Sequence, residues 1–119
     1  MPGESRSWSV YVARCSDGSL YTGIAVDVRA RIAAHDAGKG ARYTRGRGPL
    51  TLCATRRCAS HGEALRLELA VKALSRTRKE WLVAAPGRLA RLARAERARA
   101  ESARVNPKRP RKLARPRPS

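Results

Sequence analysis

The sequence predicts one small mixed α/β domain followed by a basic tail, and three observations support this. Two short stretches rich in β-branched and aromatic residues, 8–14 and 19–25, are joined by Cys-Ser-Asp-Gly, a turn sequence. Helix-capping residues then mark the starts of two helices further along the chain. The length of 119 residues is enough for one domain of about 100 residues plus appendages.

The elements are expected in the order β-β-α-β-α-α. The first two strands form a β-hairpin. Asp27 is placed to cap a helix over residues 28–36, and Gly38 is placed to end it. A third strand is expected over residues 49–54, whose sequence is PLTLCA.

Two further helices complete the predicted domain. Ser60 and Glu63 have the S-x-x-E spacing of a capping box, which predicts a second helix that runs to about Leu74. A short third helix is expected over residues 75–85. The domain therefore spans residues 8–86 and follows a short extension, residues 1–7.

The C-terminal part of the chain, residues 87–119, is its most basic region. The whole chain has 27 Lys and Arg against 9 Asp and Glu, a net charge of +18, and this region contributes +10 of it. Its first half favours a helix by composition but shows no clean apolar stripe, and its last stretch is rich in proline. We expect a partly helical or disordered tail, acting as a phosphate-attracted arm, with an inert solvated tail as the alternative.

Charge and motifs narrow the classes of function. Such a basic chain is expected to bind nucleic acid, with an anionic membrane or an acidic substrate as alternatives. No apolar run is long enough to span a membrane and residues 1–7 lack a secretory signal, so we expect a soluble, cytoplasmic protein. The three cysteines form no C-x-x-C pair, which favours reduced structural thiols over a zinc site.

Each strand of the predicted hairpin carries a tyrosine, Tyr11 and Tyr21. If the turn is a three-residue loop with Gly18 in the left-handed conformation, Tyr11 lies opposite Gly23 and both phenols project from one face. A two-residue loop shifts the register and puts them on opposite faces. Each tyrosine is then an ordinary amphipathic strand residue rather than part of a shared site.

The first helix carries Arg31 and His35, which share one helix face because they are four residues apart. Val28 and Ile32 can pack inward from the same helix. Arg31 and His35 are therefore candidate site residues, and a solvated helix face is the alternative.

The second helix places a carboxylate, Glu68, within an apolar stripe. The stripe consists of Ala64, Leu67, Val71 and Leu74. A buried carboxylate is costly without a cation or hydrogen-bond donors, and both Arg31 and a divalent metal such as Mg²⁺ are suitable partners. The alternative is a boundary glutamate that reaches solvent. A carboxylate, two phenols, an arginine and a histidine in a basic domain are the groups that metal-assisted phosphodiester hydrolysis needs.

The spacing of these residues is that of a known family. Ser9-Val10-Tyr11 precedes Tyr21-Thr22-Gly23, and the helical arginine, histidine and glutamate follow. Over about residues 8–82 this pattern resembles the GIY-YIG nuclease superfamily, in particular its small stand-alone bacterial proteins. Serine replaces the first glycine, and valine and threonine replace isoleucines, which are conservative changes on a strand. No asparagine matches the one that many members carry late in the domain, which bears on rate or substrate range.

The resemblance implies an α+β fold, a small three-stranded antiparallel sheet flanked by helices. It also implies roles for the candidate residues: Tyr21 as general base or water-positioning group, Arg31 as a contact to the scissile phosphate, and Glu68 as the single ligand of a divalent ion, Mg²⁺ or Mn²⁺. Tyr11 matches the tyrosine of the first motif, and His35 matches a position that is often tyrosine or histidine.

The loop after the first helix interleaves basic residues with one aromatic. These residues are Lys39, Arg42, Tyr43, Arg45 and Arg47. Such a loop suits phosphate contact and base stacking, and a basic surface loop without a ligand is the alternative.

The function that follows from these observations is cleavage of nucleic acid. We expect a metal-dependent endonuclease that acts on DNA, by structure more than by sequence, in DNA repair or processing. The alternative is a non-catalytic basic module that binds DNA or RNA. No membrane partner is expected, and nothing in the sequence indicates an oligomeric state.

Overall fold

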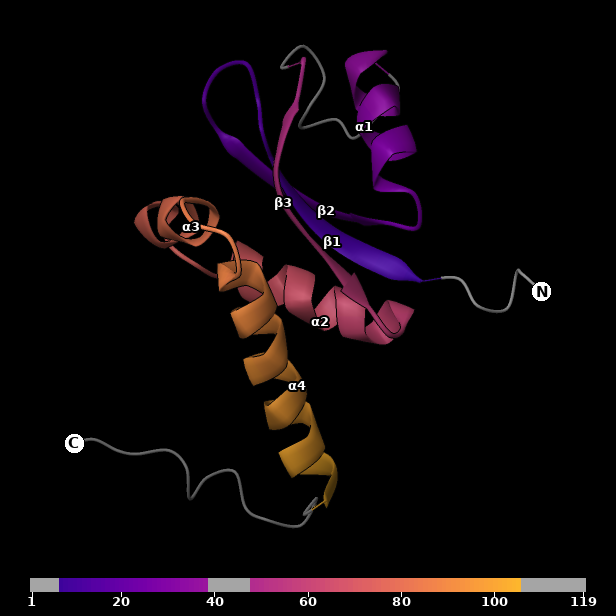
Figure 1. Ribbon diagram of the computed structural model, residues 1–119, viewed down its shortest axis with the longest axis vertical. Coiled ribbons are helices and arrows are strands. Elements are labelled where there is room, and N and C mark those ends of the chain that lie inside the picture. The colour runs from indigo at the N-terminus through magenta and orange to yellow at the C-terminus, as the bar shows by residue number, and fades with distance from the viewer. Residues whose placement is uncertain (1–6, 39–47, 106–119) are drawn as a thin grey trace.

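The structure is a computed structural model that describes residues 7–38 and 48–105. These residues form three strands and four helices (Figure 1). In chain order they are β1 (Trp8–Arg14), β2 (Leu20–Ala25), α1 (Val28–Asp36), β3 (Thr51–Cys58), α2 (His61–Lys72), α3 (Arg76–Val83) and α4 (Arg88–Val105).

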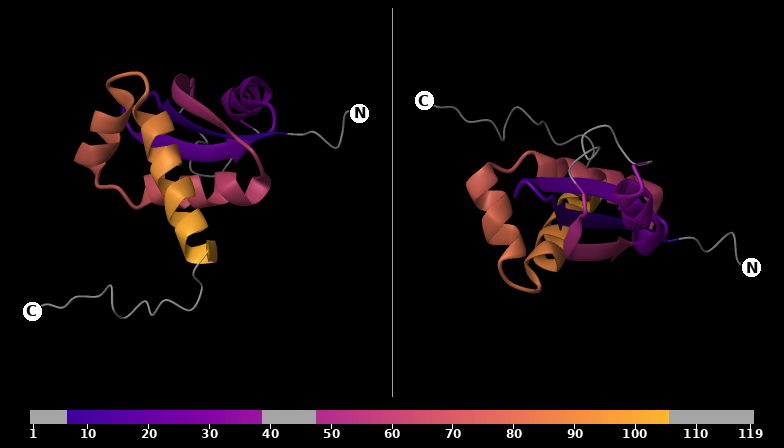
Figure 2. Two further views of the ribbon diagram at one scale, coloured as in Figure 1. Left: turned by 60° about the horizontal axis from the view of Figure 1, so that its bottom comes forward. Right: turned by 90° about the horizontal axis from the view of Figure 1, so that it is seen from above.

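The three strands form one antiparallel sheet with the order β2-β1-β3, so that β1 is central and the other two are edges. Helix α1 lies on one face of this sheet, and α2, α3 and α4 lie on the other (Figure 1; Figure 2). The predicted α+β architecture is confirmed, because the elements β1 to α3 follow in the expected order.

The larger apolar core lies between the sheet and the three later helices. Val10 and Val12 of β1 are fully buried there against Ala64, Leu67 and Val71, three members of the predicted stripe on α2. Helix α2 begins with the predicted capping box. Ser60 Oγ accepts from the backbone N–H of Glu63 at 3.1 Å, and the Glu63 carboxylate accepts from the N–H of Ala59.

The opposite face holds a smaller and more polar cluster under α1. Tyr11, Ala13 and Cys15 are buried there, and Val28 and Ile32 pack against them from the helix. Asp27 caps α1 through the N–H of Ala30 at 3.0 Å, and Gly38 follows the helix at φ 82°. The expected cap and stop of this helix are therefore confirmed.

The third strand differs most from its predicted bounds, since it spans Thr51–Cys58 rather than 49–54. Arg56 and Arg57 disfavour a strand in the sequence, but β3 is an edge strand and their side chains can reach solvent. Leu50, just before the strand, is buried, and its N–H donates to Asp36 Oδ1 at 2.9 Å. Between Val12 and Ala13 the pairing with β3 is shifted by a bulge.

The tail is expected from the sequence to be partly helical or disordered, and its residues 88–105 form the helix α4, which packs on the domain. Leu89 is buried, and Leu92 and Ala93 pack beside it on the core. These positions, i, i+3 and i+4, make a short apolar stripe limited to the first half of the helix. The remainder of the predicted tail, residues 106–119, lies outside the described residues, as does most of the N-terminal extension.

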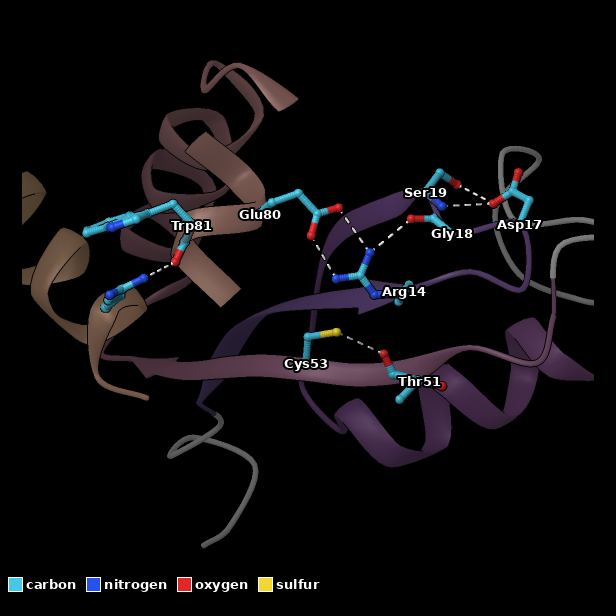
Figure 3. Close-up of polar contacts among 9 residues, drawn as sticks. Arg14, Asp17, Gly18, Ser19, Thr51, Cys53, Glu80 and Trp81 are labelled. Carbon is cyan, nitrogen blue, oxygen red and sulfur yellow. Dashed lines mark hydrogen bonds and ion pairs between the residues drawn. The ribbon is translucent and has the colours of Figure 1, made fainter. Parts of the chain in front are cut away.

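Polar contacts link α3 to the sheet and α4 to α3. Arg14 at the end of β1 makes two hydrogen bonds to the carboxylate of Glu80 on α3, at 2.8 and 3.0 Å (Figure 3). Between α3 and α4, the Arg88 guanidinium lies 4.1 Å from the ring centroid of Trp81 and donates to its carbonyl. No helix among the described residues is long and apolar enough to cross a membrane.

Candidate active site

The turn between β1 and β2 decides how the two tyrosines are arranged. Gly18 has φ 90°, the N–H of Cys15 donates to the Ser19 carbonyl at 2.8 Å, and Tyr11 lies opposite Gly23. This is the predicted three-residue loop with a left-handed glycine. Tyr21 lies across from Ala13, so both phenols are on the α1 face, with ring centroids 6.2 Å apart.

Gly23 gives the Tyr11 ring the space that it occupies. A Cβ atom at this position would lie 2.7 Å from Tyr11 Oη and 2.9 Å from its Cζ. Both distances are shorter than real carbon contacts allow. The glycine of the second motif therefore has a steric role here: it lets the phenol of the first motif lie flat across the neighbouring strand.

His35 completes a cluster of three rings. Its Nε2 lies 2.9 Å from Tyr11 Oη, and its ring contacts Tyr21 edge-on, with centroids 5.2 Å apart. Only 2% of His35 is exposed. The alternative of a fully solvated helix face is therefore wrong for His35, which turns inward, whereas Arg31 remains exposed one turn earlier.

The surroundings favour the neutral forms of both hydrogen-bonded partners. Burial raises the pKa of Tyr11 to about 12, and burial followed by the nearby charge of Arg31 lowers the pKa of His35. A neutral imidazole has one unprotonated ring nitrogen, which can accept a hydrogen bond. The bond between the Tyr11 hydroxyl and His35 Nε2 therefore joins two neutral groups.

Two charges from different helices act on the same phenol. The Arg31 guanidinium lowers the pKa of Tyr11 by its charge and by hydrogen bonding, while the Glu68 carboxylate raises it. Neither outweighs burial, but both lie within electrostatic reach of one hydroxyl. The structure thus groups Tyr11, Tyr21, His35 and Arg31 around one hydroxyl, whereas Glu68, on α2, acts on that hydroxyl only through its charge.

Arg31 also borders an open groove between β2 and α1, with a volume of about 440 Å³. The other walls of this groove are largely apolar and include Trp8, Ile24 and Val26. Arg31 is therefore presented at a surface concavity next to the ring cluster, where a bound molecule can reach its guanidinium.

Glu68 is mostly covered, with 16% of its side chain exposed, and it has a partner that the sequence analysis did not anticipate. Lys72 Nζ lies 3.1 Å from its Oε2. The expected partner was Arg31 or a divalent metal. The signal was present in the sequence, because a glutamate four residues before a lysine is a standard helical ion pair.

The residues around Glu68 can hold a magnesium-like ion only if water and substrate supply most of its ligands. Among the described residues no three His, Cys, Asp or Glu side chains lie close enough together to hold a metal. A hard ion such as Mg²⁺ is, however, often bound by one or two carboxylates, with waters and substrate phosphate completing its shell. The single carboxylate of Glu68 suits that arrangement, since its ion pair with half-exposed Lys72 is of the weak surface kind.

The basic loop residues Lys39, Arg42, Tyr43, Arg45 and Arg47 lie outside the described residues. Their expected role in nucleic-acid contact stays a prediction.

Fold and motif spacing together define a known class of catalytic domain. The GIY-YIG catalytic domain family matches residues 7–80, and the chain belongs to this family, whose domain is a nuclease fold. The matched residues include all five members of the site, and the match ends before α4 begins.

Several relatives are small proteins of about the same extent as this domain. The UPF0213 protein BH0048 of Halalkalibacterium halodurans is 55% identical over 78 residues, which is 66% of this chain and 83% of that protein. A UPF0213 protein of Halobacterium salinarum is 55% identical over 73 residues, or 61% of this chain and 95% of that one. The solution NMR structure of BH0048 is 53% identical, covers 68% of this chain and 86% of that chain, and has a TM-score of 0.46.

Proposed function

We propose that this protein is a metal-dependent endonuclease that hydrolyses phosphodiester bonds of DNA, selecting substrates by structure more than by sequence, in DNA repair or processing. The observation that supports the proposal is the grouping of Tyr11, Tyr21 and His35 in one ring cluster on the face of the sheet that α1 covers, next to the motif residues Arg31 and Glu68, whose charges both act on the pKa of Tyr11. The site would thus combine a cation for the phosphate, Arg31, with an anion for a metal ion, Glu68.

Arg31 and Tyr21 are the groups in a position to touch substrate. Arg31 is exposed beside the groove, and its planar guanidinium can bind two oxygens of a phosphodiester while negative charge builds up on them. Tyr21 is half-buried and contacts His35 edge-on, and its phenol would orient an attacking water. As the water oxygen bonds to phosphorus, the ester bond to the leaving oxygen breaks; the proton of the attacking water passes to a solvent water, and the leaving oxygen takes up a proton from solvent.

Tyr11 and His35 act through their neighbours, because they are buried and bonded to each other. Tyr11 is 0% exposed, and a phenol with a pKa of about 12 stays protonated at neutral pH. Its role is to hold the imidazole, which in turn packs against the ring of Tyr21. We therefore assign Tyr11 and His35 as positioning residues.

Glu68 would hold the divalent ion, Mg²⁺ or Mn²⁺. When bound, such an ion offsets the negative charge of the phosphate and of the leaving oxygen. The Glu68 carboxylate, now paired with the Lys72 ammonium, would hold the ion in place of that partner. Glu68 is on α2, which packs against the Val10 and Val12 face of the strand that carries Tyr11, and its charge acts on the pKa of that phenol.

The test is cleavage by the full chain and by its Glu68→Ala variant. With Mg²⁺ or Mn²⁺, we expect the wild type to cut nicked or branched DNA faster than intact duplex, and Glu68→Ala to bind the same DNA without cutting it. Glu101→Ala, at an exposed glutamate on α4, is the matched control and should cleave like the wild type. Lack of cleavage by the wild type on nicked, branched, single-stranded and duplex DNA with either metal would refute the proposal.

One observation favours the alternative, a DNA- or RNA-binding module without turnover. Glu68 already has a cationic partner in Lys72, which neutralises the one carboxylate that a metal needs. This alternative predicts salt-sensitive binding and no cleavage with any divalent ion. It also predicts that Lys72→Met leaves the protein inactive, whereas in an endonuclease this change frees Glu68 and maintains or raises cleavage at low metal concentration.

A further inference from the structure

A second basic surface lies away from the ring cluster, where α4 meets the edge strand β3. Four arginines line a shallow cavity there, together with one carboxylate, that of Glu63. We call these four residues the arginine groove: Arg56, Arg57, Arg94 and Arg97. The left view of Figure 2 shows α4 in orange crossing the sheet, and α4 contacts β3 directly.

The one carboxylate that lines the arginine groove, that of Glu63, already has two partners. One oxygen of Glu63 accepts from the N–H of Ala59, and the other lies 3.0 Å from Arg97 Nε. Arg56, Arg57 and Arg94 form no ion pair with any acidic side chain of residues 7–38 and 48–105. The groove therefore carries three uncompensated positive charges on a rigid strand and helix.

The register of β3 spreads these charges around the edge of the sheet. Arg57 pairs with Ser9, so its side chain is on the face of Tyr11, whereas Arg56 pairs with Val10 and is on the face that α4 covers. Arg94 and Arg97 are neighbours on α4, three residues apart. A ligand that follows these charges passes from the catalytic face around the open strand edge to α4.

We propose that the arginine groove binds the phosphate backbone of duplex DNA outside the cleavage site and so anchors the substrate. This inference rests on the proposed function in taking DNA as the substrate. The groove has no aromatic side chain among its lining residues, so it offers no platform for unpaired bases. Its volume of about 50 Å³ admits little more than a water-sized group, since a water takes about 30 Å³. It therefore contacts phosphate oxygens at its rim and reads no base.

Half of the groove comes from outside the family match. Arg94 and Arg97 are on α4, beyond the matched residues 7–80, whereas Arg56 and Arg57 are within them. The docking of α4, fixed by Leu89 and its neighbours, brings the two pairs together. The added helix thus completes a phosphate-binding surface rather than merely extending the chain.

The experiment compares two double variants of the full chain. Arg57→Gln with Arg94→Gln removes two groove charges and spares the Arg97 to Glu63 contact. Arg66→Gln with Arg76→Gln removes two exposed arginines elsewhere and is the matched control. Binding to a short fluorescent DNA duplex is measured without divalent metal, over a range of salt concentrations, after circular dichroism has shown that all variants are folded.

We expect the groove variant to bind more weakly and the slope of log Kd against log salt to fall by about 0.9 for each phosphate that the variant no longer neutralises. The control variant should keep the wild-type slope. In cleavage assays the groove variant should show a raised KM with little change in kcat. Equal slopes for the two double variants would overturn the proposal, and a larger loss of affinity for duplex RNA than for duplex DNA would overturn the assignment to DNA.

These outcomes separate the inference from the proposed function. If the wild type cleaves DNA but the two double variants bind alike, only the groove fails. If the wild type binds DNA without cutting it and the groove variant loses affinity, only the endonuclease proposal fails.

Discussion

Tyr11 and His35, 24 positions apart in the chain, share a buried hydrogen bond of 2.9 Å between the phenol oxygen and the imidazole Nε2. One residue comes from the central strand and the other from the helix that covers it. The bond is formed by two groups that are both held neutral by burial. It connects the strand and the helix that form the ring cluster. Because both groups titrate, the stability of the folded chain depends on pH.

Alkaline unfolding should report the state of Tyr11. Its pKa is about 12 in the folded chain and near 10 when unfolded, so the stabilisation is complete below about pH 10 and is lost between about pH 10 and 12. Two pKa units correspond to about 2 to 3 kcal/mol. Urea unfolding across this range should show the loss in the wild type but not in Tyr11→Phe. Parallel curves for the two proteins would contradict the assignment.

The titration of His35 should depend on Arg31. The pKa of His35 is lowered by burial and then by the guanidinium, so the unfolded chain takes up the proton first and stability is lost as the pH falls below about 6.5. In Arg31→Gln the pKa of His35 should rise toward its ordinary value. An NMR titration of the imidazole measures the midpoint, and an unchanged midpoint would show that the two side chains do not interact.

Gly23→Ala should destabilise the protein by about 1 to 3 kcal/mol, because the new Cβ would overlap the Tyr11 phenol. Adding Tyr11→Phe removes the nearest atom, Oη, and should recover part of the loss. Gly62→Ala is the control: the nearest atom to its added Cβ is 3.7 Å away, and it should be neutral or gain roughly 0.5 to 1 kcal/mol. Thermal unfolding of the four proteins tests this, and equal effects at both glycines would contradict it.

Helix α4 should contribute to the stability of the domain. Leu89 is buried in the main core, so Leu89→Ala should cost about 2 to 5 kcal/mol. Leu69→Ala, at a leucine that is 66% exposed, should change stability by less than about 0.5 kcal/mol. Removal of residues 87–119 should therefore lower the melting temperature. A truncated chain as stable as the full one would restore the view of this segment as an independent tail.

Local signals predicted most of the fold and the core of the site. The left-handed turn at Gly18 determines the register, and the register alone puts Tyr11 and Tyr21 on one face. Asp27 and Ser60 marked two helix starts by the same short-range chemistry. Each of these features depends on residues within a few positions of one another, so the sequence is sufficient to find it.

The features that were missed depend on tertiary contacts. Leu89 and Leu92 make too short a stripe to indicate burial until α2 and β3 are seen beside them. The inward orientation of His35 depends on a phenol in another element. The pairing of Lys72 with Glu68 is the exception, because it is local and the sequence is sufficient to predict it. The apolar stripe around Glu68 instead favoured a distant cation or a metal as its partner.

The two faces of the sheet carry different side chains, and of the five site residues only Glu68 comes from a helix on the aliphatic face. Most of the large aliphatic side chains are on the side of α2, α3 and α4, while the tyrosines and the histidine are on the side of α1. Replacing a ring on the α1 side leaves the aliphatic layer in place. The rings on the α1 face can therefore be substituted while the aliphatic core keeps the domain folded. A domain of this kind can change its substrate, or lose catalysis and still bind its ligand.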